Sequence, residues 1–162
     1  TGIEDLTLLD GAAADGTGNA SANKLIGNAS ANILDGKGGS DTLTGAGGSD
    51  DFVWDGLGTD VVTDMVLGTD IVNVAGLNIG DIETIRALAL TSGSNTILRK
   101  TLNGVVSSVQ LNAVAKASLT ASHFAFDTTS GVETINGGAN IDYLFGADGS
   151  DIINGSGNND WR

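Results

Sequence analysis

The chain has 162 residues and a formal net charge of −13, with 20 acidic residues against seven lysines and arginines. This length suffices for one or two domains, and so acidic a surface makes nucleic acid and anionic membranes poor partners. The chain has no cysteine and no proline but 25 glycines, so disulfides cannot cross-link it. It contains no stretch of about 18 apolar residues that could span a membrane, and its first residues do not resemble a signal peptide.

The first repeated pattern covers residues 18–35, as two nine-residue units, GNASANKLI and GNASANILD. Each unit starts with glycine, has asparagine at position six (Asn23 or Asn32) and leucine at position eight (Leu25 or Leu34). The spacing predicts a short strand with one inward-facing side chain. One such side chain per unit can be buried only if successive units stack, so we expect stacked turns here.

The same register is clearest from Gly36 to Val53, where GKGGSDTLT is followed by GAGGSDDFV and aspartate occupies position six, as Asp41 and Asp50. Glycine at positions one, three and four permits positive φ values and close backbone approach. These glycines are Gly36, Gly38, Gly39, Gly45, Gly47 and Gly48. The carbonyl groups of such a loop and its aspartate supply only oxygen ligands, which suit a hard cation such as Ca²⁺. Each unit therefore predicts a calcium-binding loop followed by a short strand.

The pattern continues as DGLGTDVVT and LGTDIVN, each after one inserted residue. Gly56 and Gly58 precede Asp60 in the first of these loops, and the second loop ends at Asp70. An isolated Asp-Gly pair is usually no more than a surface turn. That interpretation does not account for carboxylates that recur in register, with an apolar residue two positions after each.

Residues 82–127 are locally basic, because they hold four of the seven lysines and arginines against two acidic residues, Glu83 and Asp127. The basic residues are Arg86, Arg99, Lys100 and Lys116. Such charges usually form only a solvated face, but they are also the residues that would hold an acidic ligand.

Three elements are expected around this basic region. Asp81 is a candidate N-cap for a short helix, whose apolar face would consist of Ile82, Ile85 and Leu88. Asn103-Gly104 separates two β-rich runs and predicts a hairpin. His123, the only histidine, is expected in a strand beside Phe124, in a capping or surface role.

A C-terminal block repeats the pattern as GGANIDYLF, GADGSDIIN and GSGNNDWR, preceded by GVETIN, which mirrors GIEDLT near the N-terminus. The last repeat ends one residue short, so we expect the chain to be part of a longer repeat protein. The residues of this block that we expect to bind calcium are Glu133, Gly137, Ala139, Asp142, Gly146, Asp148, Asp151 and Asp160.

The central units resemble the RTX, or haemolysin-type, repeat GGxGxDxUx of secreted bacterial toxins, serralysin-type proteases, alginate epimerases and large adhesins. The resemblance implies an all-β fold, a right-handed parallel β-roll whose loops alternate between two sides. It also implies that each calcium ion lies between one loop and the loop two units later. Its ligands would be carbonyls from positions one and three of one loop and positions two and four of the other, with both aspartates. The segments DDFVW and SLTASHFAF resemble the region that extends and caps the roll in serralysin-type proteases and epimerase R-modules.

The resemblance also implies which carboxylates pair. Asp41 would pair with Asp60 between two glycine-rich loops, and Asp50 with Asp70 in a poorer site whose second loop begins Met-Val-Leu. In the C-terminal block, the expected pairs are Asp142 with Asp160 and Glu133 with Asp151.

The asparagine turns leave two interpretations open. An amide is a weaker calcium ligand than a carboxylate, so Asn23 and Asn32 are either weak ligands or, as we favour, side chains that hydrogen-bond within a solenoid turn.

Three regions follow: residues 1–81, a roll with degenerate N-terminal turns; 82–127, a β-rich cap with a short helix and a hairpin; and 128–162, a second, truncated roll. The leading functional hypothesis is a calcium-binding module of a type I secreted bacterial protein, which folds outside the cell and in which calcium replaces disulfide cross-links. The alternative is a polysaccharide- or surface-binding module of an adhesin or epimerase-like protein. We do not expect an enzyme, because zinc-protease, P-loop and nucleophile-elbow motifs are missing. Carboxylate pairs that could act on a glycan are already assigned to calcium.

Overall fold

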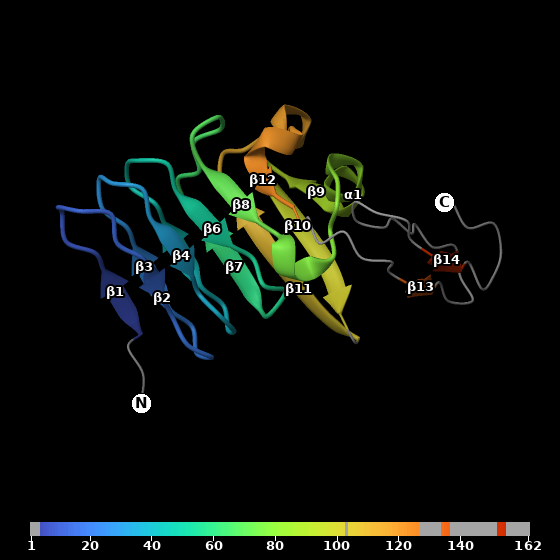
Figure 1. Cartoon of the computed structure of the whole chain (residues 1–162), viewed down its shortest axis with the longest axis horizontal. Helices are drawn as coiled ribbons and strands as arrows, with labels where there is room; N and C mark the ends of the chain where they lie inside the picture. Colours follow the sequence, from blue (N-terminus) through green and yellow to red (C-terminus); the bar gives the residue numbers. More distant parts are fainter. Residues whose placement is uncertain (1–3, 103, 127–133, 137–151, 155–162) are drawn as a thin grey trace.

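The computed structural model describes residues 4–102, 104–126, 134–136 and 152–154. In this part the chain winds as a flattened solenoid whose successive strands alternate between two sheets (Figure 1). One sheet begins with β1 (Asp5–Thr7), β3 (Lys24–Ile26), β5 (Thr42–Thr44) and β7 (Thr59–Val62). The other contains β2 (Gly16–Thr17), β4 (Ile33–Asp35), β6 (Asp51–Val53) and β8 (Ile71–Asn73). All of these strands pair in parallel, so the expected β-roll is confirmed.

The strand register stacks one apolar residue of each turn on the next. Leu25 pairs with Leu43, and Leu43 with Val62; in the other sheet, Leu34 pairs with Phe52 and Phe52 with Val72. Each of these side chains is almost completely buried, whereas its neighbours along the strand are partly exposed. Position eight of each unit between Gly18 and Asn73 therefore builds the core between the two sheets, as the sequence pattern predicted.

The C-terminal end of the roll is closed by an antiparallel extension. β11 (Val105–Leu111) continues the first sheet in parallel with β7, and then β10 (Asn95–Leu102) and β9 (Ala89–Ser92) follow antiparallel. The predicted hairpin is confirmed, because Leu102 pairs with Val105. β12 (Phe124–Ala125) extends the second sheet in parallel with β8.

A short helix, α1 (Ile82–Leu88), packs at the same end of the molecule (Figure 1). Its N-cap is Asp81, whose carboxylate accepts the amide of Thr84 at 2.7 Å, so the predicted helix and cap are confirmed. Three short 3₁₀ helices complete the cap, η1 (Ala75–Leu77), η2 (Lys116–Ser118) and η3 (Ala121–His123).

The placement of His123 in a strand was wrong. His123 is the last residue of η3, directly before β12, and its side chain is buried. The reason is local, because Thr120 and His123 form a capping box in which the imidazole Nδ1 accepts the Thr120 amide at 3.1 Å.

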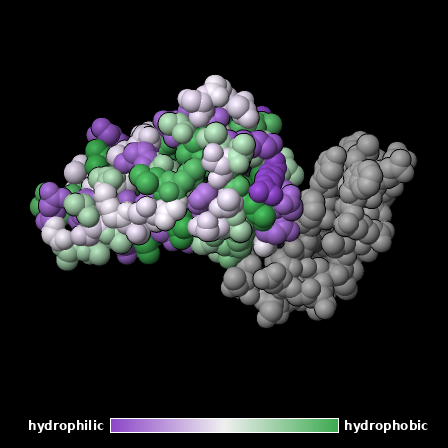
Figure 2. All heavy atoms as spheres, turned by 90° about the horizontal axis from the view of Figure 1, so that it is seen from above, coloured by the Kyte–Doolittle hydropathy of each residue, from purple (hydrophilic) through white to green (hydrophobic). Residues whose placement is uncertain are grey.

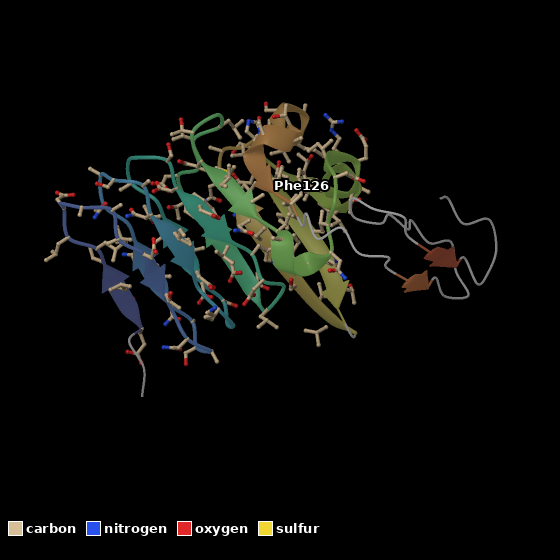
Figure 3. All side chains as sticks on the ribbon, in the orientation of Figure 1. Phe126 is labelled. Atoms are coloured by element: carbon tan, nitrogen blue, oxygen red, sulfur yellow. The ribbon has the colours of Figure 1, made fainter. Side chains whose placement is uncertain are left out.

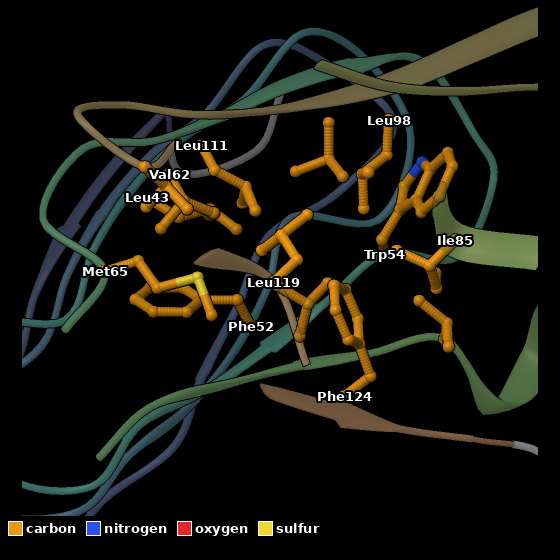
Figure 4. Packing of buried hydrophobic residues seen from close by; sticks show 14 of the residues in the cluster. Leu43, Phe52, Trp54, Val62, Met65, Ile85, Leu98, Leu111, Leu119 and Phe124 are labelled. Atoms are coloured by element: carbon orange, nitrogen blue, oxygen red, sulfur yellow. The ribbon is translucent and has the colours of Figure 1, made fainter. Parts of the chain in front are cut away.

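The buried apolar residues of the roll and the cap form one continuous cluster, part of which is shown in Figure 4. Trp54, from the turn after β6, lies between Leu98 and Ile85, and Met65 lies beside Phe52. The indole Nε1 of Trp54 donates a 3.1 Å hydrogen bond to Ser107 Oγ on β11. The rings of Phe124 and Phe126 are 5.9 Å apart at this end, where Phe126 is labelled in Figure 3.

Figure 2 shows exposed apolar side chains interspersed with polar ones, which is ordinary for a protein surface; Val105 and Val106 are exposed neighbours on β11. No helix of the described chain is long and apolar enough to cross a membrane.

Beyond the cap, β13 (Thr134–Asn136) pairs in parallel with β14 (Ile152–Asn154), with Thr134 opposite Ile152. Paired residues are equally far apart in the sequence in the main roll, where Lys24 lies opposite Thr42. The division into three regions stays a prediction.

Candidate metal centre

The position-six residues of the loops before β3, β5 and β7 form one column. The amide of Asn23 donates to Asp41 Oδ1 at 2.7 Å, and the amide of Asp41 donates to Asp60 Oδ1 at 3.1 Å. All three side chains are buried. The structure therefore brings together Asp41 and Asp60, the pair that the sequence favoured.

A second column lies before β4, β6 and β8 and has the same geometry. The amide of Asn32 donates to Asp50 Oδ1 at 2.9 Å, and the amide of Asp50 donates to Asp70 Oδ1 at 3.0 Å. Asp70 differs in that its other oxygen, Oδ2, accepts the amide of Val66 from its own loop at 2.7 Å. Backbone donors therefore occupy both Asp70 oxygens, which agrees with the expectation of a poorer site.

Glycine is required where neighbouring loops touch. A Cβ atom on Gly58 would lie 1.7 Å from the carbonyl oxygen of Gly39, and Gly58 has φ +95°. At Gly36 and Gly45, a Cβ would lie 2.3 Å from Oδ2 of the aspartate at position six of the same loop. Gly38 and Gly47 are less constrained, because a Cβ there would meet nothing nearer than 3.7 Å.

The columns concentrate negative charge in poorly solvated surroundings. Burial raises the pKa of Asp60 to about 7, and the negative charge of Asp41 adds to the shift. Burial likewise raises the pKa of Asp50 to about 6 and raises that of Asp41. Oδ2 of Asp41 is buried without a hydrogen-bond partner among the described residues. A cation bound beside it would therefore relieve both the unpaired oxygen and the charge repulsion.

No basic side chain of the described chain provides that cation. The ion pairs found there are Lys37 with Asp35 and Arg86 with Glu83, so none of the column aspartates has a basic partner. No three carboxylate, histidine or cysteine side chains converge on one point within the described ranges. An ion between the loops must therefore take most of its oxygen ligands from backbone carbonyls, as glycine-rich loops allow. This donor set fits Ca²⁺, which binds six to eight oxygens.

The sequence pattern missed three carboxylates, Asp35, Asp55 and Asp64, which we call the outer aspartates. Asp35 Oδ1 accepts the amide of Lys37, and Asp55 Oδ1 accepts that of Leu57, both at 2.9 Å. Asp64 accepts two amides, from Gly45 at 2.8 Å and from Ala46 at 2.9 Å. Asp35 and Asp64 stand directly before the first residue of a loop, and Asp55 is itself the first residue of one; this position was the available signal.

The asparagine turns are satisfied by hydrogen bonds. Asn23 Oδ1 accepts the amide of Asn19 at 2.7 Å, and Asn32 Oδ1 accepts that of Asn28 at 2.8 Å. Asn32 Nδ2 also donates to the carbonyl of Ala14 in the neighbouring turn at 2.7 Å. These bonds support the hydrogen-bonded interpretation of the asparagine turns.

The remaining predicted site residues, in the C-terminal block, lie outside the described residues: Glu133, Gly137, Ala139, Asp142, Gly146, Asp148, Asp151 and Asp160.

The family model of the RTX calcium-binding nonapeptide repeat, in four copies, matches residues 17–52 and 127–161. The chain carries RTX repeats. The matched repeat is a calcium-binding repeat, so these two segments of the chain are calcium-binding repeats. A comparison with curated proteins gives no match.

Two solved structures are similar to the RTX chain. The AlgE6R2 subunit of the Azotobacter vinelandii mannuronan C5-epimerase is 24% identical, with 80% of this chain and 96% of that chain covered and a TM-score of 0.52. The AlgE6R3 subunit of the same enzyme is 22% identical, with 80% and 87% covered and a TM-score of 0.49. The first likeness shows that the two chains share a fold.

Proposed function

We propose that calcium binding drives the folding of this RTX module, which belongs to a type I secreted bacterial protein and becomes ordered outside the cell, where calcium is abundant. The observation that carries the proposal is the pair Asp41 and Asp60, two buried carboxylates in one column without a basic partner. An ion held between their loops would join two turns that otherwise repel each other.

The free energies involved favour folding that depends on calcium. Ordering glycine-rich loops costs about 1 to 2 kcal/mol per residue in backbone entropy, and each turn of the roll buries one position-eight side chain to offset it. A bound ion contributes about 2.7 kcal/mol when its concentration is 100 times the dissociation constant. Two or more ions would therefore decide whether the central turns are ordered.

Circular dichroism and thermal melting, in millimolar calcium and in excess chelator, test this proposal. We expect calcium to increase the β signal and the melting temperature, and magnesium at the same concentration to do so much less, because Mg²⁺ retains its water ligands. An unchanged spectrum and melting temperature in chelator would contradict it.

A second candidate function is the binding of an acidic polysaccharide by the cap. A hollow of about 580 Å³ lies there, lined among others by Arg86, Lys116, Thr91 and Ser94. Its size is typical of ligand sites, and its two cations stand out in a chain of net charge −13. The similarity to subunits of a mannuronan epimerase suggests a uronate polymer as the ligand.

Titration calorimetry with mannuronan oligosaccharides, in the presence of calcium, tests this second function. The double substitution Arg86→Ser and Lys116→Ser should abolish binding, whereas Arg99→Ser on the exposed face of β10 should not. Binding that survives the double substitution, or no binding by the unaltered chain, would exclude the hollow as the site.

A further inference from the structure

Five loops in the described part of the chain have one of two conformations, which differ in where the second residue of the loop directs its amide. In one conformation that amide donates to the position-six side chain of its own loop. In the other it donates outward to an outer aspartate. The difference decides whether the position-six oxygen is available to a cation.

Three loops have the inward amide. Asn19 donates to Asn23 at 2.7 Å, Asn28 donates to Asn32 at 2.8 Å, and Val66 donates to Asp70 at 2.7 Å. An N–H group so placed occupies the acceptor oxygen and directs its positive end toward the place where a cation would bind. These loops are therefore poor calcium partners, whether position six carries an amide or a carboxylate.

The two best RTX loops have the outward amide. Lys37 has φ 64° and donates to Asp35, and Ala46 has φ 70° and donates to Asp64. Both residues are in the left-handed region, which costs free energy for any residue with a side chain. In the first of these loops, the consequence is visible at Asp41, whose Oδ2 is buried and has no hydrogen-bond partner among the described residues.

We propose that the outer aspartates Asp35 and Asp64 are positioning residues, which hold the loops at Gly36 and Gly45 in the calcium-competent conformation without binding the ion themselves. Asp64 gives the sharper case, because its two oxygens accept the successive amides of Gly45 and Ala46. This inference rests on the proposed calcium-binding function and adds to it the residues that select which loops bind.

The test is calcium titration calorimetry on the full chain with four variants. Asp64→Ala should weaken one site about tenfold or more, the effect of losing hydrogen bonds to a charged group, without removing the site. Asp64→Asn should recover only part of the affinity, because its single amide oxygen can accept one of the two N–H groups while its NH2 group faces the other. Ala46→Gly added to Asp64→Ala should also recover affinity, because glycine adopts the left-handed conformation unaided.

Asp15→Ala is the matched control, since Asp15 is an exposed carboxylate that accepts the amide of Ile33 at 3.0 Å but lies before an asparagine turn. It should leave every calcium affinity unchanged, and circular dichroism in saturating calcium should show that all variants fold. The inference is overturned if Asp64→Ala binds like the unaltered chain. It is equally overturned if Ala46→Gly gives no recovery, because Asp64 would then not act through the left-handed conformation of Ala46. Failure of the unaltered chain to bind calcium would instead refute the proposed function.

Discussion

The amide of Asp41 donates a 3.1 Å hydrogen bond to Oδ1 of Asp60, nineteen residues later in the chain. The same stacking places Leu43 opposite Val62 in the sheet. Core and metal centre are therefore built by one register, because each turn sets both the depth of its apolar side chain and the height of its carboxylate. A substitution in the core should therefore also alter the calcium-binding loops, and a substitution in a loop should alter the packing of the core.

Calcium stoichiometry should separate the aspartate loops from the asparagine loops. Asp41→Ala removes a buried carboxylate from the column and should lose at least one ion, whereas Asn23→Ala should leave the number of bound ions unchanged, since the Asn23 oxygen already accepts an amide. Titration calorimetry gives the count for each variant. Equal losses would mean that the asparagine turns bind calcium as well.

Glycine substitutions should differ by position within one loop pair. Gly58→Ala places a Cβ 1.7 Å from the Gly39 carbonyl oxygen at φ +95° and should destabilise the calcium-bound roll by about 3 kcal/mol or more. Gly38→Ala, where a Cβ meets only ordinary contacts at 3.7 Å, should cost less than about 1 kcal/mol. Urea unfolding in saturating calcium measures both, and similar midpoints for the two variants would contradict the close approach of the loops.

Acid should stabilise the calcium-free roll. Burial raises the pKa of Asp60 to about 7 and that of Asp50 to about 6, against about 3.9 in an unfolded chain. The folded form thus holds these protons more tightly, so its stability is highest below about pH 4 and falls as the pH rises through about 6 to 7.

Melting in chelator at pH 5 and pH 8 checks this expectation, with the higher melting temperature at pH 5. Asp60→Asn should flatten the difference, because it removes the group with the largest shift. A calcium-free roll that melts higher at pH 8 would show that other carboxylates dominate its pH dependence.

Asn32 should stabilise the roll independently of calcium. Its side chain joins two turns, accepting the amide of Asn28 and donating to the carbonyl of Ala14. Asn32→Ala should therefore lower the free energy of unfolding by about 1 to 3 kcal/mol, by the same amount in calcium and in chelator. A loss seen only in calcium would identify Asn32 as a ligand.

Much of the roll could be predicted from sequence because one residue type at a fixed position of each repeat sets the strand register. The resemblance to RTX repeats paired Asp41 with Asp60, and the spacing of Leu43 and Phe52 placed the core. The helix at Asp81 and the hairpin between Leu102 and Val105 were also predictable, since both depend on local signals.

Other features depend on contacts that no local pattern encodes. Trp54 meets Ser107 across 53 residues of chain, and the parallel pairing of β11 with β7 depends on how the cap folds back. The role of Asp64 depends on the φ angle of Ala46, a residue in another turn. His123 was misplaced because its capping bond to Thr120 outweighs the strand preference of the apolar residues that follow.

The two ends of the described roll have contacts between neutral groups. The asparagine turns are joined by neutral side-chain bonds, and the cap is held by its apolar core. The aspartate columns lie between them. We expect calcium bound between these loops to stiffen the segment that connects the two ends. Pulling on single molecules should then show a compliant middle segment in chelator and none in calcium, so that whatever the module carries is presented at a defined distance only where calcium is plentiful.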